Sequence, residues 1–287
     1  MRTAPFEYHR AQDLDDALEW LAGDGDRDVK ILAGGHSLLP LMKLKLATPT
    51  VLLDVQDVPE LRGILLESGW VRIGALTRYV DLTRDATVGD SLPLLSQVAA
   101  TVADIQVRNR GTIGGSLCHA DPAADIPAAV LALDARLVLV GPRGERRVNL
   151  DEFTVAPFLT VLEPTEILTA IEFPIPLQSQ QSTYLKRPHP ASGYPVVGVA
   201  ITGDASPHEP LSNVRVAVTG IGPKAYRAEK TEGTLKGQVP TPELFRAAAD
   251  VAITEANMSD EPDLSYREQL TRVYVERALY QFYGGVA

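Results

Sequence analysis

Two short glycine-rich segments constrain this chain more than any other feature of its sequence. The first is Ala33-Gly34-Gly35-His36-Ser37, which directly follows an apolar run starting at Val29. The second, Thr112-Ile113-Gly114-Gly115-Ser116, repeats the pattern of paired glycines beside hydroxyl side chains. Adjacent glycines adopt backbone conformations that other residues avoid, and they let several N–H groups approach one anion. Two such turns suit a ligand with two linked phosphates, although two unrelated tight turns are the alternative interpretation.

Other motifs that carry chemistry are missing. Neither segment matches the GxGxxG or GxxxxGK[ST] fingerprint, and the sequence contains no GxSxG or SxxK nucleophile motif. His36 and His119 lie near the two turns without a second ligand at metal-binding spacing, so we expect them to form hydrogen bonds. Cys118 is the single cysteine, and one thiolate cannot hold an iron–sulfur cluster by itself. We therefore predict neither a catalytic side chain nor a metal site.

Composition limits the class of protein. With 287 residues, of which 45% are hydrophobic and 22% charged, the chain is long enough for a folded protein of two domains. Its net charge of -10 disfavours binding to nucleic acid. We expect no membrane span, because no apolar run approaches about 20 residues. The N-terminal residues lack the apolar core of a secretory signal, so we expect a cytoplasmic protein.

The first part of the chain reads as mixed helix and strand. Apolar residues at helical spacing predict a helix at 14–21 and another that starts at Pro93 and continues through Ile105. Buried strands are expected at 29–33, 50–55 and 136–140, and a hairpin at 63–75. Asp121 and Asp125 precede a helix that begins near Ile126. They either cap that helix or place a carboxylate on a ribose or adenine group.

The segment between Phe173 and Tyr194 is rich in Pro, Gln and Ser, which predicts an interdomain connection or a mobile loop with a boundary near residue 176. Lys186, Arg187 and His189 would form a solvated basic patch there, and Tyr194 would belong to the core or an interface. Beyond the boundary, strands at 196–201 and 214–218 and helices at 242–255 and 265–282 predict a small α+β domain.

The two glycine segments and the residues around them resemble those of a known family. The segments AGGHSLLPLMKLKLATPTVLLDV and VRNRGTIGGSLCHADPAADIPAAVLAL resemble the FAD-binding medium subunits of molybdenum-containing hydroxylases, such as those of aerobic carbon monoxide dehydrogenases and, more distantly, xanthine dehydrogenases. The resemblance implies an α+β chain with a flavin-binding fold of the vanillyl-alcohol oxidase type over 1–175. This domain would consist of two α/β subdomains, about 1–57 and 58–175, followed by a flavoprotein C-terminal domain at 176–287.

The resemblance also implies which residues contact FAD. The two glycine segments would hold the pyrophosphate, and Asp125 would contact the adenosine part. Leu168, in the strand EILTAIEFP, and Lys186, in a Y-x-K segment, would also belong to the site. Tyr194 would shield one face of the isoalloxazine.

In this family the chain is one of three. A small subunit holds two [2Fe-2S] clusters and a large subunit holds the molybdenum cofactor, with electrons passing to FAD and then to a quinone or NAD. The resemblance implies a dimer of heterotrimers. Two alternatives stay open at the level of the sequence. One is an autonomous FAD oxidase, with flavin attached through His36, and the other is a flavin-free scaffold, which four glycines in two turns argue against.

Overall fold

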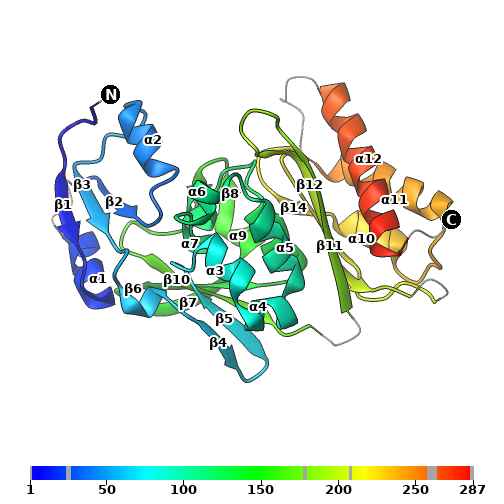
Figure 1. The fold of residues 1–287 in the computed structure, drawn as a ribbon, viewed down its shortest axis with the longest axis horizontal. Coiled ribbons are helices and arrows are strands. Elements are labelled where there is room, and N and C mark those ends of the chain that lie inside the picture. The colour runs from blue at the N-terminus through cyan, green and yellow to red at the C-terminus, as the bar shows by residue number, and fades with distance from the viewer. Residues whose placement is uncertain (1, 24–26, 177–179, 207–208, 257–263, 285–287) are drawn as a thin grey trace.

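A computed structural model describes residues 2–23, 27–176, 180–206, 209–256 and 264–284. In Figure 1 the chain runs from the N-terminal elements at the left, through a central sheet with its helices, to a C-terminal sheet and helices at the right. The order of strands in each sheet is β1-β3-β2, then β4-β5-β10-β6-β7, then β11-β12-β13-β14, with a small β8-β9 pair.

The N-terminal elements form a parallel three-stranded sheet with two helices. They are β1 (Glu7–Arg10), α1 (Leu14–Ala22), β2 (Val29–Leu32), α2 (Leu38–Lys43) and β3 (Val51–Asp54). The central strand is β3, all four residues of which are buried. Helix α1 begins where Asp13 accepts a hydrogen bond from the Asp16 N–H, which satisfies one free donor of the first turn. The predicted helix at 14–21 and the predicted strands at 29–33 and 50–55 are confirmed.

The central sheet is antiparallel and carries helices on one face. Its strands are β4 (Ile64–Glu67), β5 (Trp70–Gly74), β6 (Arg136–Gly141), β7 (Gly144–Asn149) and β10 (Ile167–Pro174). The helices that follow the predicted hairpin are α3 (Tyr79–Arg84), α4 (Ala86–Ser91), α5 (Pro93–Thr101), α6 (Ile105–Arg108), α7 (Ile113–His119) and α8 (Ile126–Ala132). Apolar side chains of the strands and of α5 and α8 share one buried core. Four short elements complete this part: η1 (Pro59–Leu61), α9 (Leu150–Phe153) and the paired strands β8 (Thr154–Ala156) and β9 (Leu159–Thr160).

The helix predicted from Pro93 through Ile105 is two helices. The first, α5, ends at Thr101, Ala103 takes a left-handed conformation with φ of 40°, and α6 starts after Asp104. The Asp104 carboxylate accepts hydrogen bonds from the N–H groups of Gln106 and Val107, at 2.7 and 3.0 Å. A strong N-cap therefore outweighs the continuing apolar spacing.

The C-terminal elements form a sheet with helices on one face. They are β11 (Gln180–Pro188), β12 (Pro195–Asp204), β13 (Arg215–Thr219), β14 (Tyr226–Arg227), α10 (Glu229–Leu235), α11 (Pro242–Glu255) and α12 (Leu264–Phe282). Alternate residues of β12 face opposite sides. Val199 and Ile201 pack in the core with α11 and α12, whereas Ala200 packs in the core of the N-terminal part. The sheet thus lies between its own helices and the central helices, as Figure 1 shows.

The prediction of a connection or mobile loop between Phe173 and Tyr194 is wrong over most of its length. Residues 180–188 form β11, which pairs antiparallel with β12 through nine residues. The segment is polar for two reasons. Strand β11 lies at the edge of its sheet. Its buried side chains also include those of Tyr184 and Lys186, which form hydrogen bonds with Asp125 of the N-terminal part. The connection itself at 177–179 lies outside the described residues.

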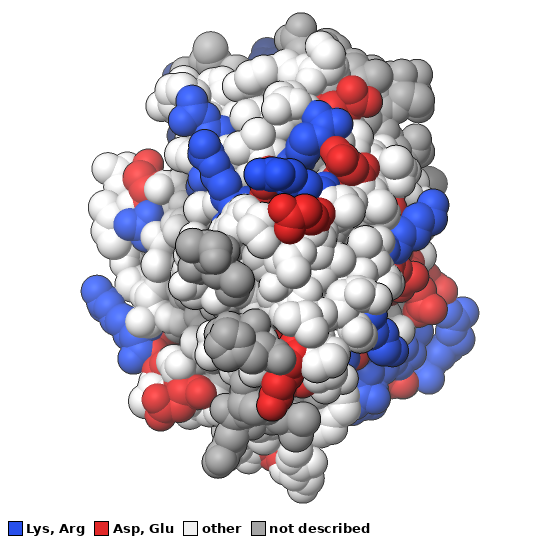
Figure 2. Space-filling view, turned by 90° about the vertical axis from the view of Figure 1, so that its right-hand side faces the viewer, with Lys and Arg blue, Asp and Glu red and all other residues white. Residues whose placement is uncertain are grey.

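The C-terminal end of the molecule, at the right of Figure 1, carries side chains of both charges. Figure 2 shows that Lys and Arg lie beside Asp and Glu on this face, without a single-sign patch. Two ion pairs join α11 to α12 there, Arg272 to Asp250 at 2.6 Å and Arg246 to Glu276 at 3.4 Å. No helix among the described segments has the length and apolar character to cross a bilayer.

Candidate functional site

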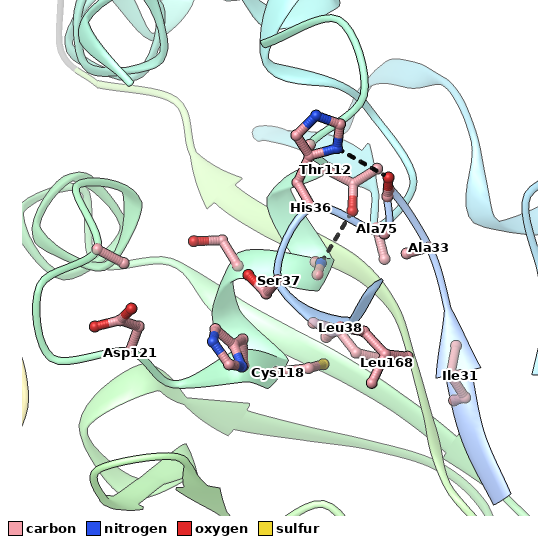
Figure 3. Close-up of a pocket in the computed structure, with 18 of the residues that line it drawn as sticks. Ile31, Ala33, His36, Ser37, Leu38, Ala75, Thr112, Cys118, Asp121 and Leu168 are labelled. Atoms are coloured by element: carbon pink, nitrogen blue, oxygen red, sulfur yellow. Dashed lines mark hydrogen bonds between the residues drawn. The ribbon is translucent and has the colours of Figure 1, made fainter. Parts of the chain in front are cut away.

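A large cavity lies where the three parts of the chain meet. Its volume is about 800 Å³, which is in the range of sites that hold cofactors. Both glycine segments line it, as Figure 3 shows, and Ser192, Gly193 and Tyr194 of the β11–β12 hairpin close one end. Residues of β2 and the start of β10 also line it, and Figure 3 shows Ile31 and Leu168 on the side opposite Asp121. The structure therefore brings the two sequence motifs to one site.

The first glycine turn offers free hydrogen-bond donors. Gly35 has φ of 78°, a conformation that favours glycine, and it turns the chain from β2 into α2. Within the described part of the chain, the four N–H groups from Gly34 to Ser37 have no hydrogen-bond acceptor. The Ser37 hydroxyl forms no cap either. This row of donors beside a cavity is the arrangement that binds an anion.

The second glycine turn is different, because its donors already have partners. The N–H groups of Ile113 and Gly114 donate to the carbonyl oxygens of Thr77 and Ala75, at 3.0 and 2.9 Å. The Gly115 N–H donates to Thr112 Oγ1 at 3.1 Å, the N-cap bond of α7 drawn in Figure 3, and the Ser116 N–H donates to the Thr112 carbonyl. Among the described residues, N–H groups free to meet an anion are therefore found in the first turn and not in the second.

Glycine is needed in both turns for close packing. A Cβ on Gly114 would lie 2.8 Å from the Ala75 carbonyl oxygen, and one on Gly34 would overlap the Arg110 carbonyl oxygen. A Cβ on Gly115 would lie 2.7 Å from Thr112 Oγ1. Because Arg110 lies two residues before Thr112, the overlap at Gly34 shows that the backbones approach closely there, and a larger residue at Gly34 would force them apart.

Asp125 lies at the hairpin end of the cavity with all its oxygens occupied. Its carboxylate accepts from the Tyr184 hydroxyl at 2.7 Å and from Lys186 Nζ at 2.9 and 3.1 Å. It stands at the N-cap position of α8 without making a cap bond, so the capping interpretation is wrong for Asp125. Asp121 accepts from the Ala123 N–H at 2.9 Å. Burial raises the pKa of the Asp125 carboxyl, and the Lys186 ammonium and the Tyr184 hydroxyl oppose that rise.

Most of the residues predicted for the site line this cavity, and two do not. Those that line it are Ala33, Gly34, Gly35, His36, Ser37, Thr112, Gly114, Gly115, Ser116, Asp125, Leu168 and Tyr194. Ile113 is buried in the core, and Lys186 lies on β11 behind Asp125. The prediction of a solvated basic patch is wrong for Lys186, whose side chain is 7% exposed.

The cavity also contains residues that sequence reasoning did not assign to it. Tyr79, at the start of α3, is buried beside the second turn, and burial raises its pKa to about 12. Cys118 and His119 follow Ser116 on α7. Burial raises the pKa of the Cys118 thiol to about 12 and lowers the pKa of His119. Because Cys118 and His119 lie on the same short helix as Ser116, the sequence could have predicted them for the site. No motif near Tyr79 in the sequence predicts that it belongs to the site.

The described residues contain no group of three His, Cys, Asp or Glu side chains that could hold a metal ion. The cavity instead provides free N–H donors at 34–37, apolar walls from residues such as Ile31 and Leu168, and a hydrogen-bonded carboxylate at one end. These residues fit an elongated ligand that carries phosphate near its middle and a planar group at an end, as a flavin dinucleotide does.

Comparison with protein-family models finds two matches in sequence order. Residues 4–176 match the FAD binding domain in molybdopterin dehydrogenase. Residues 182–282 match the CO dehydrogenase flavoprotein C-terminal domain.

Individual relatives align over nearly the whole chain. The carbon monoxide dehydrogenase medium chain of Hydrogenophaga pseudoflava is 40% identical over 276 residues, 96% of each chain. The 6-hydroxypseudooxynicotine dehydrogenase complex subunit alpha of Paenarthrobacter nicotinovorans is 35% identical, over 97% of this chain and 95% of that one. Among solved structures, carbon monoxide dehydrogenase from Hydrogenophaga pseudoflava has a TM-score of 0.94 at 39% identity over 100% of both chains. Quinoline 2-oxidoreductase from Pseudomonas putida has a TM-score of 0.91 at 29% identity over 99% of both.

Proposed function

Since the chain belongs to the family of FAD-binding subunits of molybdenum-containing hydroxylases, we propose that it accepts electrons from the [2Fe-2S] clusters of a partner subunit and passes them to an external acceptor. FAD supplies the redox chemistry, and the protein binds and orients it. The observation that supports this best is the row of free N–H donors at 34–37 beside a cavity of about 800 Å³.

The first turn would neutralise the pyrophosphate through backbone dipoles. A chain of net charge -10 has little positive side-chain charge to offer, and four N–H groups aimed at one place provide the attraction locally. The second turn would provide the facing wall, with the Ser116 side chain and the glycine backbone in contact with the cofactor. Leu168 and Tyr194 would contact FAD elsewhere in the cavity. Asp125 would line the hairpin end, and Ile113 and Lys186 would act from behind the wall.

Asp125 and Tyr194 lie at the same end of the cavity, because Asp125 bonds Lys186 of the hairpin that carries Tyr194 and both residues line the cavity. An adenosine contact by Asp125 and an isoalloxazine contact by Tyr194 therefore do not fit one extended FAD molecule. We propose that this end receives the isoalloxazine, because Tyr79 and Tyr194 both line it. The adenosine would then extend toward β2, past Lys30 and Ile31.

The division of the chain at residue 176 belongs to the same proposal. Residues 1–175 would form the FAD-binding domain, with subdomains at about 1–57 and 58–175, and residues 176–287 the C-terminal domain. Separate apolar clusters around β3, around the central sheet and around α11 and α12 support these three units.

Partner subunits would hold the other redox groups. The single cysteine cannot supply the four ligands that a [2Fe-2S] cluster needs, so the clusters would lie on a small iron–sulfur subunit and the molybdenum cofactor on a large subunit. The relatives named above include subunits of such complexes. We further propose a dimer of heterotrimers with a quinone or NAD as acceptor. Location in the cytoplasm stays a prediction, which cell fractionation would check.

The experiment that tests the proposal is visible absorption of the purified full chain, before and after acid precipitation. We expect the two absorption bands of oxidised flavin, with FAD released into the supernatant in a ratio of about one per chain. Colour that stays in the pellet would favour the covalent oxidase, with His36 as the attachment point. If neither the chain nor its copurified complex binds added FAD, the site is wrong.

A further inference from the structure

The C-terminal sheet closes the cavity through one hairpin. Strands β11 and β12 are joined by the turn that places Ser192, Gly193 and Tyr194 in the cavity wall. Gly193 has φ of 72°, and a Cβ there would lie 3.4 Å from the Ala103 Cα. The tip of the hairpin therefore packs against the loop that follows α5. Tyr194 itself is 41% exposed, so contacts elsewhere must hold it in place.

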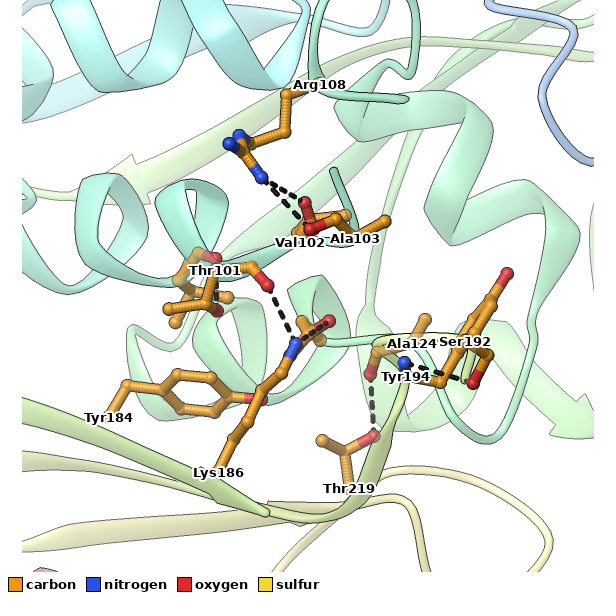
Figure 4. A network of polar contacts seen from close by, with 12 residues as sticks. Thr101, Val102, Ala103, Arg108, Ala124, Tyr184, Lys186, Ser192, Tyr194 and Thr219 are labelled. Carbon is orange, nitrogen blue, oxygen red and sulfur yellow. Dashed lines mark hydrogen bonds and ion pairs between the residues drawn. The ribbon is translucent and has the colours of Figure 1, made fainter. Parts of the chain in front are cut away.

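Those contacts come from β11 of the same hairpin. Lys186 Nζ donates to the Thr101 carbonyl at 2.8 Å and to both oxygens of Asp125, as Figure 4 shows for the cluster around it. Gln97 of α5 bonds the backbone of Tyr184 twice, accepting from its N–H at 3.1 Å and donating to its carbonyl at 3.4 Å. Strand β11 is thus bonded to α5 and α8 of the N-terminal part.

The ion pair between Asp125 and Lys186 is buried on both sides. The side chain of Asp125 is 4% exposed and that of Lys186 is 7% exposed. One oxygen of Asp125 accepts from both Tyr184 and Lys186, and the other accepts from Lys186. The carboxylate is neutralised by groups of the protein, which makes it poorly suited to act alone as the ligand of a ribose or a ring nitrogen.

We propose that Asp125 and Lys186 act together as a positioning pair, which holds the β11–β12 hairpin and Tyr194 against the flavin end of the cavity. The inference rests on the proposed function, because it assumes that FAD occupies the cavity. Neither residue needs to touch the cofactor for this role. The pair would favour FAD binding in two ways: its bonds fix the position of the hairpin, and its two charges cancel, so that no net charge lies at that end of the cavity.

A double-mutant cycle separates positioning from direct contact. Lys186→Met leaves the Asp125 charge buried without a partner, and Asp125→Asn does the same to Lys186. A buried charge without its partner is strongly unfavourable, while loss of both charges is far milder. We expect each single variant of the full chain to bind FAD about tenfold more weakly, and the double variant to recover most of that loss.

Flavin fluorescence gives a readout that a general loss of stability would not change. If Tyr194 packs on the isoalloxazine, it quenches the emission of bound FAD. We expect emission from saturated Lys186→Met to rise and from the double variant to return toward wild type. If Lys186→Met matches wild type in affinity and emission, while Asp125→Asn and the double variant lose binding equally, then Asp125 contacts FAD directly and the proposal is wrong.

Two further variants serve as controls. Arg215→Met removes another ion pair between the same two parts, to Asp134 at 2.8 Å, away from the cavity. It should leave FAD affinity and emission unchanged, and an effect equal to that of Lys186→Met would contradict a specific role.

Tyr184→Phe removes one hydrogen bond to Asp125 without changing charge. It should change FAD affinity and emission in the same direction as Lys186→Met, by a smaller amount. This variant tests the proposal if Lys186→Met does not fold. Wild type that binds no FAD would contradict the proposed function itself.

Discussion

The two glycine turns have nearly the same sequence pattern and opposite hydrogen-bond states. At 34–37 the N–H groups have no partner among the described residues, and the Ser37 hydroxyl forms no cap. At 113–116 each N–H donates to Ala75, Thr77 or Thr112, and Thr112 caps α7. In the first turn glycine provides a positive φ at Gly35 and close packing at Gly34, and the N–H groups are free. In the second turn glycine provides close packing at Gly114. A shared motif therefore does not establish a shared role.

The largest effect is expected where packing fails outright. Gly34→Ala places a methyl group on the Arg110 carbonyl oxygen, so the backbones of the two turns must separate. We expect FAD affinity to fall at least about a hundredfold and the free energy of unfolding to fall by about 3 kcal/mol. Titration with FAD and chemical denaturation measure these changes. A variant that binds FAD like wild type would show that the turns do not meet as described.

In the second turn, a substitution of glycine should mainly lower the free energy of unfolding. Gly114→Ala overlaps Ala75 and should lower the free energy of unfolding of the flavin-free chain by about 2 kcal/mol. Gly114→Asp would act mainly through the same overlap. Gly89→Ala in α4 is the matched control, because a Cβ there has open space. It should raise stability by about 0.5 to 1 kcal/mol. If Gly114→Ala is as stable as wild type, the packing role is wrong.

The hydroxyl groups of Thr112 and Ser37 should have different effects, one on stability and the other on FAD affinity. Thr112→Val removes the N-cap of α7 and should lower the free energy of unfolding by about 1 kcal/mol, with little change in FAD affinity. Ser37→Ala should leave stability unchanged and weaken FAD binding by about tenfold, because its hydroxyl is free for a charged oxygen. The comparison is contradicted if the two variants exchange these effects.

The smallest effect concerns Cys118, which reports on the packing of α7. Burial raises its thiol pKa to about 12, so the reactive thiolate is scarce at pH 8. Alkylation by iodoacetamide, followed by mass spectrometry, should be much slower than for a free thiol. It should accelerate in Gly114→Ala and not in Ser37→Ala. Equal rates in all three proteins would show that the second turn does not control this helix.

Local patterns were enough to predict much of the fold. Helix α11 begins and ends where Pro242 and Glu255 predict, and the hairpin at 63–75 forms with Ser68 and Gly69 at its turn. The edge strand β11 was missed because its polar residues are satisfied by bonds to α5 and α8, 59 to 87 residues away. No local signal encodes such partners.

The same limit applies to the site. The glycine pairs identify both turns, but only the positions of the Ala75 and Thr77 carbonyl groups show that the second turn has no free donors. The Asp125–Lys186 pair joins residues that are 61 apart in sequence. The family resemblance placed both residues near FAD, and the structure shows that they bond each other.

Amide hydrogen exchange of the full chain, with and without FAD, tests the contrast between the turns most directly. The N–H groups of residues 34–37 should exchange rapidly without FAD and slowly with it, because the cofactor supplies their missing acceptor. Those of residues 113–116 should be protected in both states by their existing bonds. Protection that develops only at 113–116 when FAD binds, with no change at 34–37, would contradict the account.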